Sequence, residues 1–185
     1  MEALEAIHMR QSTGKVQPTP VPRELIENLL AAAAQAPNHY KVRPWRFVVL
    51  TGAARARLGE AMAQALQQRN PQAKPEVLEV ERKKPLRAPV LIAVGVDRPG
   101  EPKVKEIENI CAAAAATQNL LIAAQALGLG AMWRTGDAAR EPGVKQFLGL
   151  APDQPLIGFI YVGYPLNLPL PVERPAAADR TTWME

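Results

Sequence analysis

Three short segments of this 185-residue chain carry polar side chains whose types and spacing suit the binding of an anionic or planar ligand. The first is Arg10-Gln11-Ser12, in which a guanidinium and a hydroxyl two residues apart can both donate to one phosphate. Charge-assisted hydrogen bonds of this kind contribute about 1.5–3 kcal/mol each. A solvated helix end accounts for the same residues, because basic side chains favour the last turn of a helix. Alone, the segment leaves both interpretations open.

The second segment runs from Gln35 to Trp45, between an expected helix and an expected strand. Pro37 and Pro44 restrict its backbone, and it carries amide, imidazole, ammonium and guanidinium groups close to the indole of Trp45. These groups suit a planar ligand that forms hydrogen bonds. The alternative is a rigid connector in which Trp45 covers the core.

The third segment runs from Gly128 to Gly136. Its first glycines end a long helix, and an apolar strand then delivers Arg134 and Thr135 beside Gly136, where the backbone can approach a ligand closely. An ordinary helix end followed by a strand end explains the same pattern.

Protein-based nucleophiles and metal centres have little support in the sequence. There is no phosphate-binding loop of the G-x-x-x-x-G-K-[ST] type, no G-x-G-x-x-G after a strand and no H-E-x-x-H motif. With two histidines and one cysteine, a metal site within one chain is not expected. Cys111 is expected to be a small buried residue of a core helix. An enzyme of this kind would take its reactivity from a bound cofactor.

The composition indicates a soluble globular protein with no affinity for nucleic acid or membrane. Hydrophobic residues make up 48% of the chain, and the 22 basic and 18 acidic residues are interleaved without a long basic run. The N-terminus lacks the basic start and apolar run of a secretory signal. Polar residues interrupt the apolar stretch 111–133, which indicates a core helix, and we expect a cytoplasmic protein.

Apolar periodicity predicts an α+β fold in one domain, residues 1–185, with helices around one sheet. Strands are expected at 47–50, 90–96, 131–134 and 157–163, and helices at 2–10, 22–36, 53–69, 104–127 and 142–148. The apolar run 90–96 must be covered on both faces. Thr51 is a candidate cap for the helix that begins near residue 53.

Two segments lack clear periodicity. Residues 70–87 are charged and interrupted by proline, and we expect a mobile or partly helical excursion over the surface. The tail, residues 166–185, contains Pro169, Pro171 and Pro175 and is expected to be either disordered or extended along a partner subunit.

Taken together and in order, the three polar segments resemble the nitroreductase superfamily, most of all the short bacterial NAD(P)H nitroreductases of the YdjA-like pattern. The resemblance runs from Arg10-Gln11-Ser12 through Ala36-Pro37 and Pro44-Trp45 to residues 128–136 and 157–163. It implies the nitroreductase-like fold, with a central, mainly antiparallel sheet flanked by helices, in an intertwined homodimer that holds FMN at the subunit interface.

The resemblance also implies roles for individual residues. Within one subunit, the FMN phosphate and ribityl region would be bound by Arg10, Gln11 and Ser12, and the phosphate and ring site would be closed by Trp133, Arg134 and Thr135. Gln35 and His39 would reach the flavin from the partner subunit. The nicotinamide cofactor would lie at the end of the long helix, against Ala123, Ala124, Gln125, Ala126, Leu127 and Gly128.

The chain departs from the family pattern at several basic positions. Gln11 and Gly14 stand where many members carry a basic residue, and Lys15 comes one position late. The resemblance places position 14 near the N1–C2 carbonyl edge of the flavin. Lys41 and Arg43 replace an Asn and a Gln of the usual pattern and could supply the missing charge, although a surface role explains them equally well.

The function implied is an FMN-dependent NAD(P)H oxidoreductase that reduces nitro compounds or other small acceptors by ping-pong hydride transfer through flavin N5. No protein residue is expected to be catalytic, and no metal is implied. Two alternatives stay open: a flavin enzyme of other chemistry, such as enone reduction, dehalogenation or flavin breakdown, and a non-catalytic flavin-binding dimer.

Overall fold

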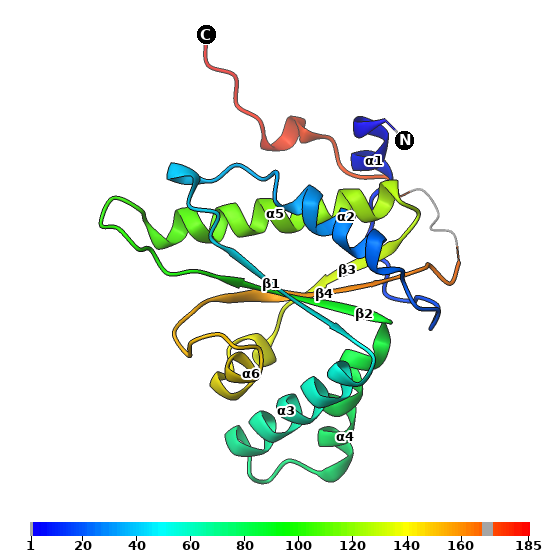
Figure 1. Cartoon of the computed structure of the whole chain (residues 1–185). Helices are drawn as coiled ribbons and strands as arrows, with labels where there is room; N and C mark the ends of the chain where they lie inside the picture. Colours follow the sequence, from blue (N-terminus) through cyan, green and yellow to red (C-terminus); the bar gives the residue numbers. More distant parts are fainter. Residues whose placement is uncertain (1, 168–171) are drawn as a thin grey trace.

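The computed structural model describes residues 2–167 and 172–185, and its centre is a four-stranded antiparallel sheet (Figure 1). The strands are arranged in the order β1-β2-β4-β3. Their bounds are β1 Trp45–Thr51, β2 Val90–Val96, β3 Gly130–Arg134 and β4 Leu156–Gly163. All three strand pairings are antiparallel, which confirms the predicted sheet.

The second strand is buried along its whole length because helices cover both faces of the sheet. All seven residues of β2 are buried, as the unbroken apolar run requires. Alternate side chains enter two separate cores: Ile92 and Val94 join one, and Leu91 and Ala93 join the other. The two cores therefore meet only through the strands.

Helices lie on both sides of the sheet, with α2 and α5 on one face and α3, α4 and α6 on the other (Figure 1). The α-helices are α1 Ala3–Met9, α2 Arg23–Ala33, α3 Ala53–Arg69, α4 Pro75–Lys83, α5 Glu106–Ala126 and α6 Pro142–Phe147. Short 3-10 turns are η1 His39–Lys41, η2 Lys84–Arg87, η3 Asp137–Ala139 and η4 Ala177–Arg180. The predicted helices are confirmed, and the excursion 70–87 is largely helical.

The excursion α3–α4–η2 begins and ends at neighbouring points of the sheet. It leaves β1 after Thr51 and re-enters β2 at Val90, and these two residues are register partners. The sequence predicted Thr51 as the cap of α3, and this prediction is wrong. Thr51 is the last residue of β1, and Gly52 occupies the cap position without a side-chain hydrogen bond. The strand extends further than predicted, so the hydroxyl of Thr51 belongs to the strand end.

The long helix α5 does not bury its cysteine. Ala113, Ala116 and Ala124 face the core, whereas Cys111 is exposed on the face that points away from the sheet. The expectation of a buried thiol is wrong for the single chain, because the alanine-rich sequence gives no strong apolar asymmetry to fix the helix rotation.

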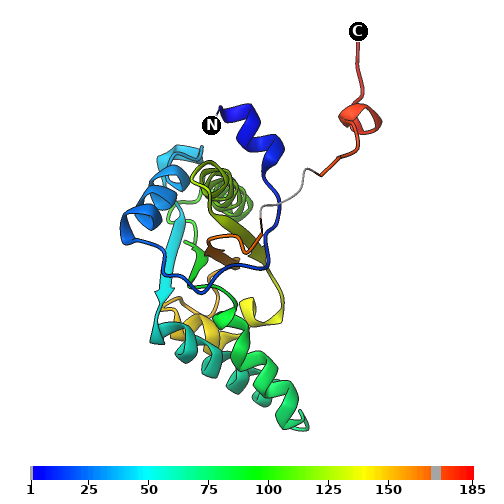
Figure 2. The ribbon, with the colours of Figure 1, turned by 90° about the vertical axis from the view of Figure 1, so that its right-hand side faces the viewer.

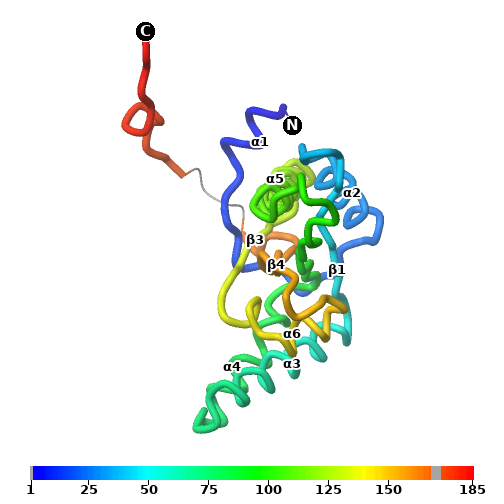
Figure 3. The backbone as a smooth tube through the Cα atoms, turned by 90° about the vertical axis from the view of Figure 1, so that its left-hand side faces the viewer, coloured from blue at the N-terminus to red at the C-terminus, as the bar shows by residue number. Residues whose placement is uncertain are grey.

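The segment after α1 runs beside β3 (Figure 3). Ser12 forms a parallel bridge with Ala131, and the Thr13 amide donates to the Ala131 carbonyl at 2.9 Å. A Cβ atom at Gly130 would lie 2.7 Å from Thr13 Cγ2, so this approach depends on a residue without a side chain.

The C-terminal tail extends away from the rest of the chain, as two perpendicular views show (Figures 1 and 2). Residues 168–171 of the predicted tail, which include Pro169 and Pro171, lie outside the described residues. Residues 172–185 contain one 3-10 turn, and Trp183 is 87% exposed. Among the described helices, none is long and apolar enough to cross a membrane.

We expect Gly59→Ala to loosen the packing of α4 on α3. A Cβ atom at position 59 would overlap the carbonyl oxygen of Arg82, so the two helices must move apart. Overpacking of this kind costs about 1–3 kcal/mol, measured as the free energy of unfolding in urea. Gly143→Ala in α6 is the matched control, because a Cβ there meets nothing within 4 Å. Equal stability of the two variants would contradict the tight contact.

Candidate functional site

Two arginines from opposite ends of the chain lie together beside the end of α1. Arg174 in the tail donates from Nη2 to the backbone carbonyl oxygen of Arg10. Burial, and then the positive charge of Arg174, lower the pKa of the Arg10 guanidinium from its ordinary value. Two neighbouring guanidinium groups repel each other, so an anion placed between them would be stabilised by both.

Residues 12–14 connect this arginine pair to the end of β3. Because the segment runs along the strand, a Cβ atom at Gly14 would lie 3.7 Å from Nη2 of Arg134. Met132 Sδ is closer still, at 3.1 Å from that Cβ position, so the Arg134 guanidinium lies beside Gly14 at ordinary contact distance.

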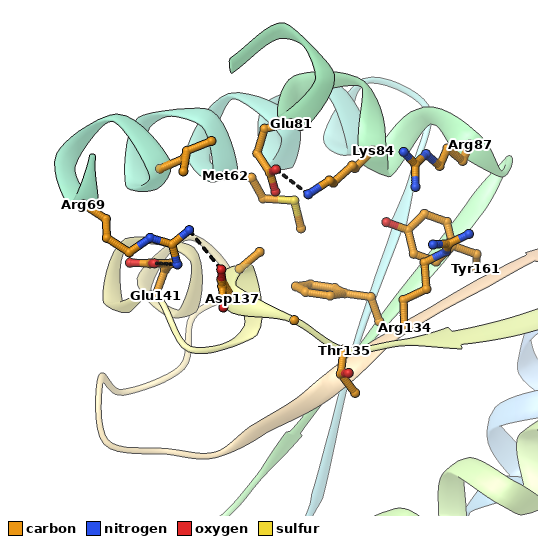
Figure 4. Close-up of a pocket in the computed structure, with 14 residues that line it drawn as sticks. Met62, Arg69, Glu81, Lys84, Arg87, Arg134, Thr135, Asp137, Glu141 and Tyr161 are labelled. Carbon is orange, nitrogen blue, oxygen red and sulfur yellow. Dashed lines mark hydrogen bonds and ion pairs between the residues drawn. The ribbon is translucent and has the colours of Figure 1, made fainter. Parts of the chain in front are cut away.

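Beyond Arg134 lies a pocket of about 330 Å³ between the sheet and the α3–α4 excursion (Figure 4). Its volume is at the lower end of the ~300–1,000 Å³ typical of small-molecule sites. Helical segments form one wall, and the ends of β3 and β4 form the other. The lining residues are Met62, Leu66, Arg69, Glu81, Lys84, Arg87, Arg134, Thr135, Gly136, Asp137, Ala138, Glu141, Phe159 and Tyr161.

Ion pairs neutralise one part of this pocket. Arg69 pairs with Asp137 at 3.1 Å and with Glu141 at 2.9 Å. Lys84 pairs with Glu81, whose side chain is only 12% exposed. The carboxylates of the pocket are thus engaged by these two cations (Figure 4).

Arg87 and Arg134 lie near the ring of Tyr161 in the same pocket (Figure 4). The guanidinium carbon of Arg134 is 5.8 Å from the centroid of that ring. Burial raises the pKa of the Tyr161 phenol above its ordinary value, although the charges of Arg87 and Arg134 oppose that shift. At neutral pH the phenol therefore keeps its proton.

The structure brings some of the predicted site residues together and separates others. Arg134 and Thr135 line the pocket, and Ser12 lies one strand spacing from β3. The side chain of Trp133 points to the opposite face of the sheet, where it packs against the core and donates from Nε1 to the Ile157 carbonyl at 3.1 Å. Trp133 is therefore not among the residues that line the pocket.

His39 lies far from Arg10 within one chain. His39 Nε2 is 3.9 Å from Glu108 Oε1, in the first turn of α5, whereas α1 lies toward the other end of that helix (Figure 1). Gln35 is exposed, and the His39 side chain is 51% exposed. Both groups are therefore available to a neighbouring molecule.

The loop that carries His39 has an unusual backbone. Tyr40, Lys41 and Arg43 all have positive φ angles, of 49°, 55° and 49°. The Arg43 amide donates to Asn38 Oδ1 at 2.8 Å, and Lys103 lies 4.5 Å from the centre of the Tyr40 ring. These contacts hold the loop in a conformation that non-glycine residues seldom adopt.

The segment 123–128, predicted to contact the nicotinamide cofactor, forms the end of α5 and its cap. Ala124 is fully buried, whereas Ala126, Leu127 and Gly128 are exposed. Only part of this segment is thus accessible to a ligand.

Comparison with known proteins places this architecture in a family. The model of the nitroreductase family matches residues 7–164. YdjA of Escherichia coli (strain K12), which carries the name of an NAD(P)H nitroreductase, is 31% identical over 166 residues, covering 89% of each chain. YfhC of Bacillus subtilis (strain 168), similarly named, is 28% identical and covers 97% of this chain and 93% of its own.

The chain belongs to the nitroreductase family. Solved structures agree with this assignment. A nitroreductase-like protein from Bacillus cereus has a TM-score of 0.86 at 24% identity, covering all of this chain and 97% of its own. A nitroreductase-type protein from Desulfovibrio desulfuricans, solved in complex with FMN, has a TM-score of 0.74 at 27% identity and covers 100% and 98% of the two chains.

Several residues of this nitroreductase site were not predicted from the sequence. Arg87 precedes the buried strand β2, and Tyr161 is two residues after Phe159, on the same face of β4. Strand alternation could have placed Tyr161 beside the pocket. Arg174 lies in a tail without periodicity, so no sequence pattern connects it with Arg10.

Within the single chain, Lys15, Lys41 and Arg43 do not line this pocket. Lys41 and Arg43 belong to the loop near the start of α5. Lys15 is exposed, and its carbonyl accepts from the Leu166 amide at 3.1 Å. Arg134 is the cation that lies beside Gly14.

We expect the buried Tyr161 to make stability depend on alkaline pH. Because its folded-state pKa is raised, its contribution is fully present below about pH 10 and is lost as the pH rises toward the folded-state value. The free energy of unfolding of Tyr161→Phe should therefore decline less between pH 9 and 11 than that of the unmodified protein. Urea titrations would measure this, with exposed Tyr40→Phe as control. Parallel curves for all three proteins would contradict the buried phenol.

Proposed function

We propose that the chain is an FMN-dependent NAD(P)H oxidoreductase that passes electrons to nitro compounds or other small acceptors. One observation carries the proposal: the Arg10–Arg174 pair and the cation-lined pocket lie at the two ends of one strip, formed by residues 12–14 along β3. FMN has a matching shape and charge, with a dianionic phosphate at one end and a planar polar ring at the other.

The phosphate end fits the residues present. Arg10 and Arg174 are adjacent cations, and Ser12 offers a hydroxyl two residues further along the segment. A dianion between the guanidinium groups would relieve their repulsion, which adds to burial in lowering the pKa of Arg10. Gln11 can add a hydrogen bond from its amide.

The pocket end fits a planar ring with polar edges. Thr135 and Gly136 present backbone groups, and the φ of 127° at Gly136 allows the chain to turn away directly after β3. Arg134 offers positive charge, and Phe159 offers an apolar surface. The bound complex of the Desulfovibrio desulfuricans relative supports FMN as the group held here.

When bound, flavin supplies two-electron chemistry, accepting electrons from NAD(P)H and passing them to an acceptor in turn. The residues of this chain bind and orient it. Arg10, Arg174 and Ser12 would fix the phosphate, and the α3–α4 excursion would limit access of water to the pocket. The donor would approach near residues 123–128, where Ala126, Leu127 and Gly128 are exposed.

The proposed enzyme is a homodimer. Gln35 and His39 are exposed, and His39 lies by the first turn of α5, at the other end of that helix from α1, so it could meet a flavin only if a second subunit supplied one. The exposed apolar side chain of Ile107, 62% exposed, and exposed Cys111 lie on the same helix as Glu108. A symmetric contact through this surface would bring each loop 38–43 to the partner.

The proposal is tested by the visible spectrum of the purified protein before and after anaerobic addition of NADPH. Flavin absorbance that bleaches with NADPH and returns with a nitroarene supports it. A colourless protein that FMN does not stabilise against heat would refute it, and flavin that NADPH does not reduce would favour a non-catalytic flavin-binding dimer.

Arg10→Ala should weaken FMN retention. The loss of one charge-assisted contact predicts a dissociation constant about tenfold or more higher. FMN retention by the variant should be weakest at high salt, which also screens the remaining charge of Arg174, while the ratio of the two dissociation constants should shrink because the Arg10 charge is screened as well. Fluorescence titration with FMN would measure it. Arg23→Ala, at a side chain 90% exposed on α2, is the control and should change nothing. Unchanged retention in Arg10→Ala would contradict the phosphate role.

Removal of residues 177–185 should weaken the dimer. The tail extends from the chain and ends in exposed Trp183 and Met184, which are 87% and 93% exposed, so the proposed partner would bury them. Sedimentation velocity over a concentration series would show a higher dissociation constant for the truncated protein. The shortened chain keeps Arg174, so its FMN site stays intact. A truncated protein that dimerises like the full chain would rule out this role for the tail.

A further inference from the structure

The charges inside the pocket are not balanced. Four cations and three carboxylates line it. Arg69 engages two of the carboxylates and Lys84 engages the third. Among the described residues, no carboxylate forms an ion pair with Arg87 or Arg134, and Figure 4 draws none between them and the rest of the lining.

These two free cations lie at one place. Both act on the phenol of Tyr161, whose ring is 7% exposed, and the Arg134 guanidinium lies 5.8 Å from its centroid. Two positive charges beside one ring attract a ligand that carries negative charge, and solvent screens the charge of exposed Arg87 more than that of partly buried Arg134. A ligand that gains negative charge in this pocket is thus favoured over its neutral form.

We propose that Arg87, together with Arg134, selectively stabilises the reduced flavin and so sets its reduction potential. This inference rests on the proposed function. The oxidised ring is neutral; when NAD(P)H gives up two electrons and one proton and leaves as NAD(P)⁺, the ring carries one negative charge. Arg134 lies beside Gly14 at the end of β3, and Arg87 belongs to η2 in the excursion. The positive charge around the ring thus comes from both walls of the pocket.

Arg87 is the residue at which stabilisation of the reduced flavin can be tested separately from binding of the oxidised flavin. It ends η2, its side chain is exposed, and it forms no ion pair or hydrogen bond that the fold needs. Arg134, by contrast, is also expected to hold the oxidised cofactor. Arg87 is therefore a residue whose removal should change the ratio of the two affinities and leave binding of oxidised FMN intact.

The test is Arg87→Met in the FMN-loaded protein. The midpoint potential is measured by equilibration with a reference dye, and the dissociation constant of oxidised FMN by fluorescence. We expect the preference for reduced over oxidised FMN to fall about tenfold, which for two electrons lowers the potential by about 30 mV. The dissociation constant of oxidised FMN should stay within twofold. Sulfite, which adds to flavin and leaves a negative charge on the ring, should bind about tenfold more weakly.

Two further variants complete the experiment. Arg57→Met removes the same charge from an exposed position on α3 outside the pocket and should leave the potential unchanged. Arg87→Lys keeps the charge, so its midpoint potential should stay close to that of the unmodified protein. Equal potentials for Arg87→Met and Arg57→Met would overturn the inference, as would a loss of oxidised FMN from Arg87→Met. A wild-type protein that binds no FMN would instead refute the proposed function itself.

Discussion

The close run of residues 12–14 along the edge strand β3 is the constraint on which the site depends. The Thr13 amide donates to the Ala131 carbonyl, and Gly130 leaves room for the side chain of Thr13. This contact brings a segment from the start of the chain to a strand more than a hundred residues later. Without this contact, the positions of Arg10 and Arg134 relative to each other would not be fixed.

Electrostatics divides the cations near this strip into two kinds. Arg69 and Lys84 have carboxylate partners and serve mainly to hold the pocket wall together. Arg10 and Arg174 repel each other, and Arg87 and Arg134 have only the ring of Tyr161 between them. Like charges held together destabilise a folded chain, so such pairs are more typical of ligand sites than of structural contacts.

The sequence predicts the fold well where packing is strongly patterned. The run 90–96 forms a strand that is buried on both faces, as its seven successive apolar residues predict, and α3 has the predicted bounds 53–69. Thr51 and Cys111 were predicted wrongly, because a cap or a buried thiol depends on where a strand ends and how a helix is rotated. Apolar periodicity fixes neither the last residue of a strand nor the rotation of an alanine-rich helix.

The site was only partly predictable for a related reason. Arg134, Thr135 and Ser12 belong to local motifs, whereas Arg87, Tyr161 and Arg174 come near them only through strand order and the path of the tail. Such long-range proximity is a property of the topology, and no short pattern in the sequence encodes it.

The register pairing of Thr51 with Val90 has a consequence for how this family can diversify. The α3–α4 excursion leaves and re-enters the sheet at these adjacent residues, and its core is separate from the one beneath α5. Any insertion whose ends meet at that spacing could be grafted there without disturbing the run of residues 12–14 along β3. Evolution can therefore remodel one wall of the pocket while the contact between residues 12–14 and β3 is kept.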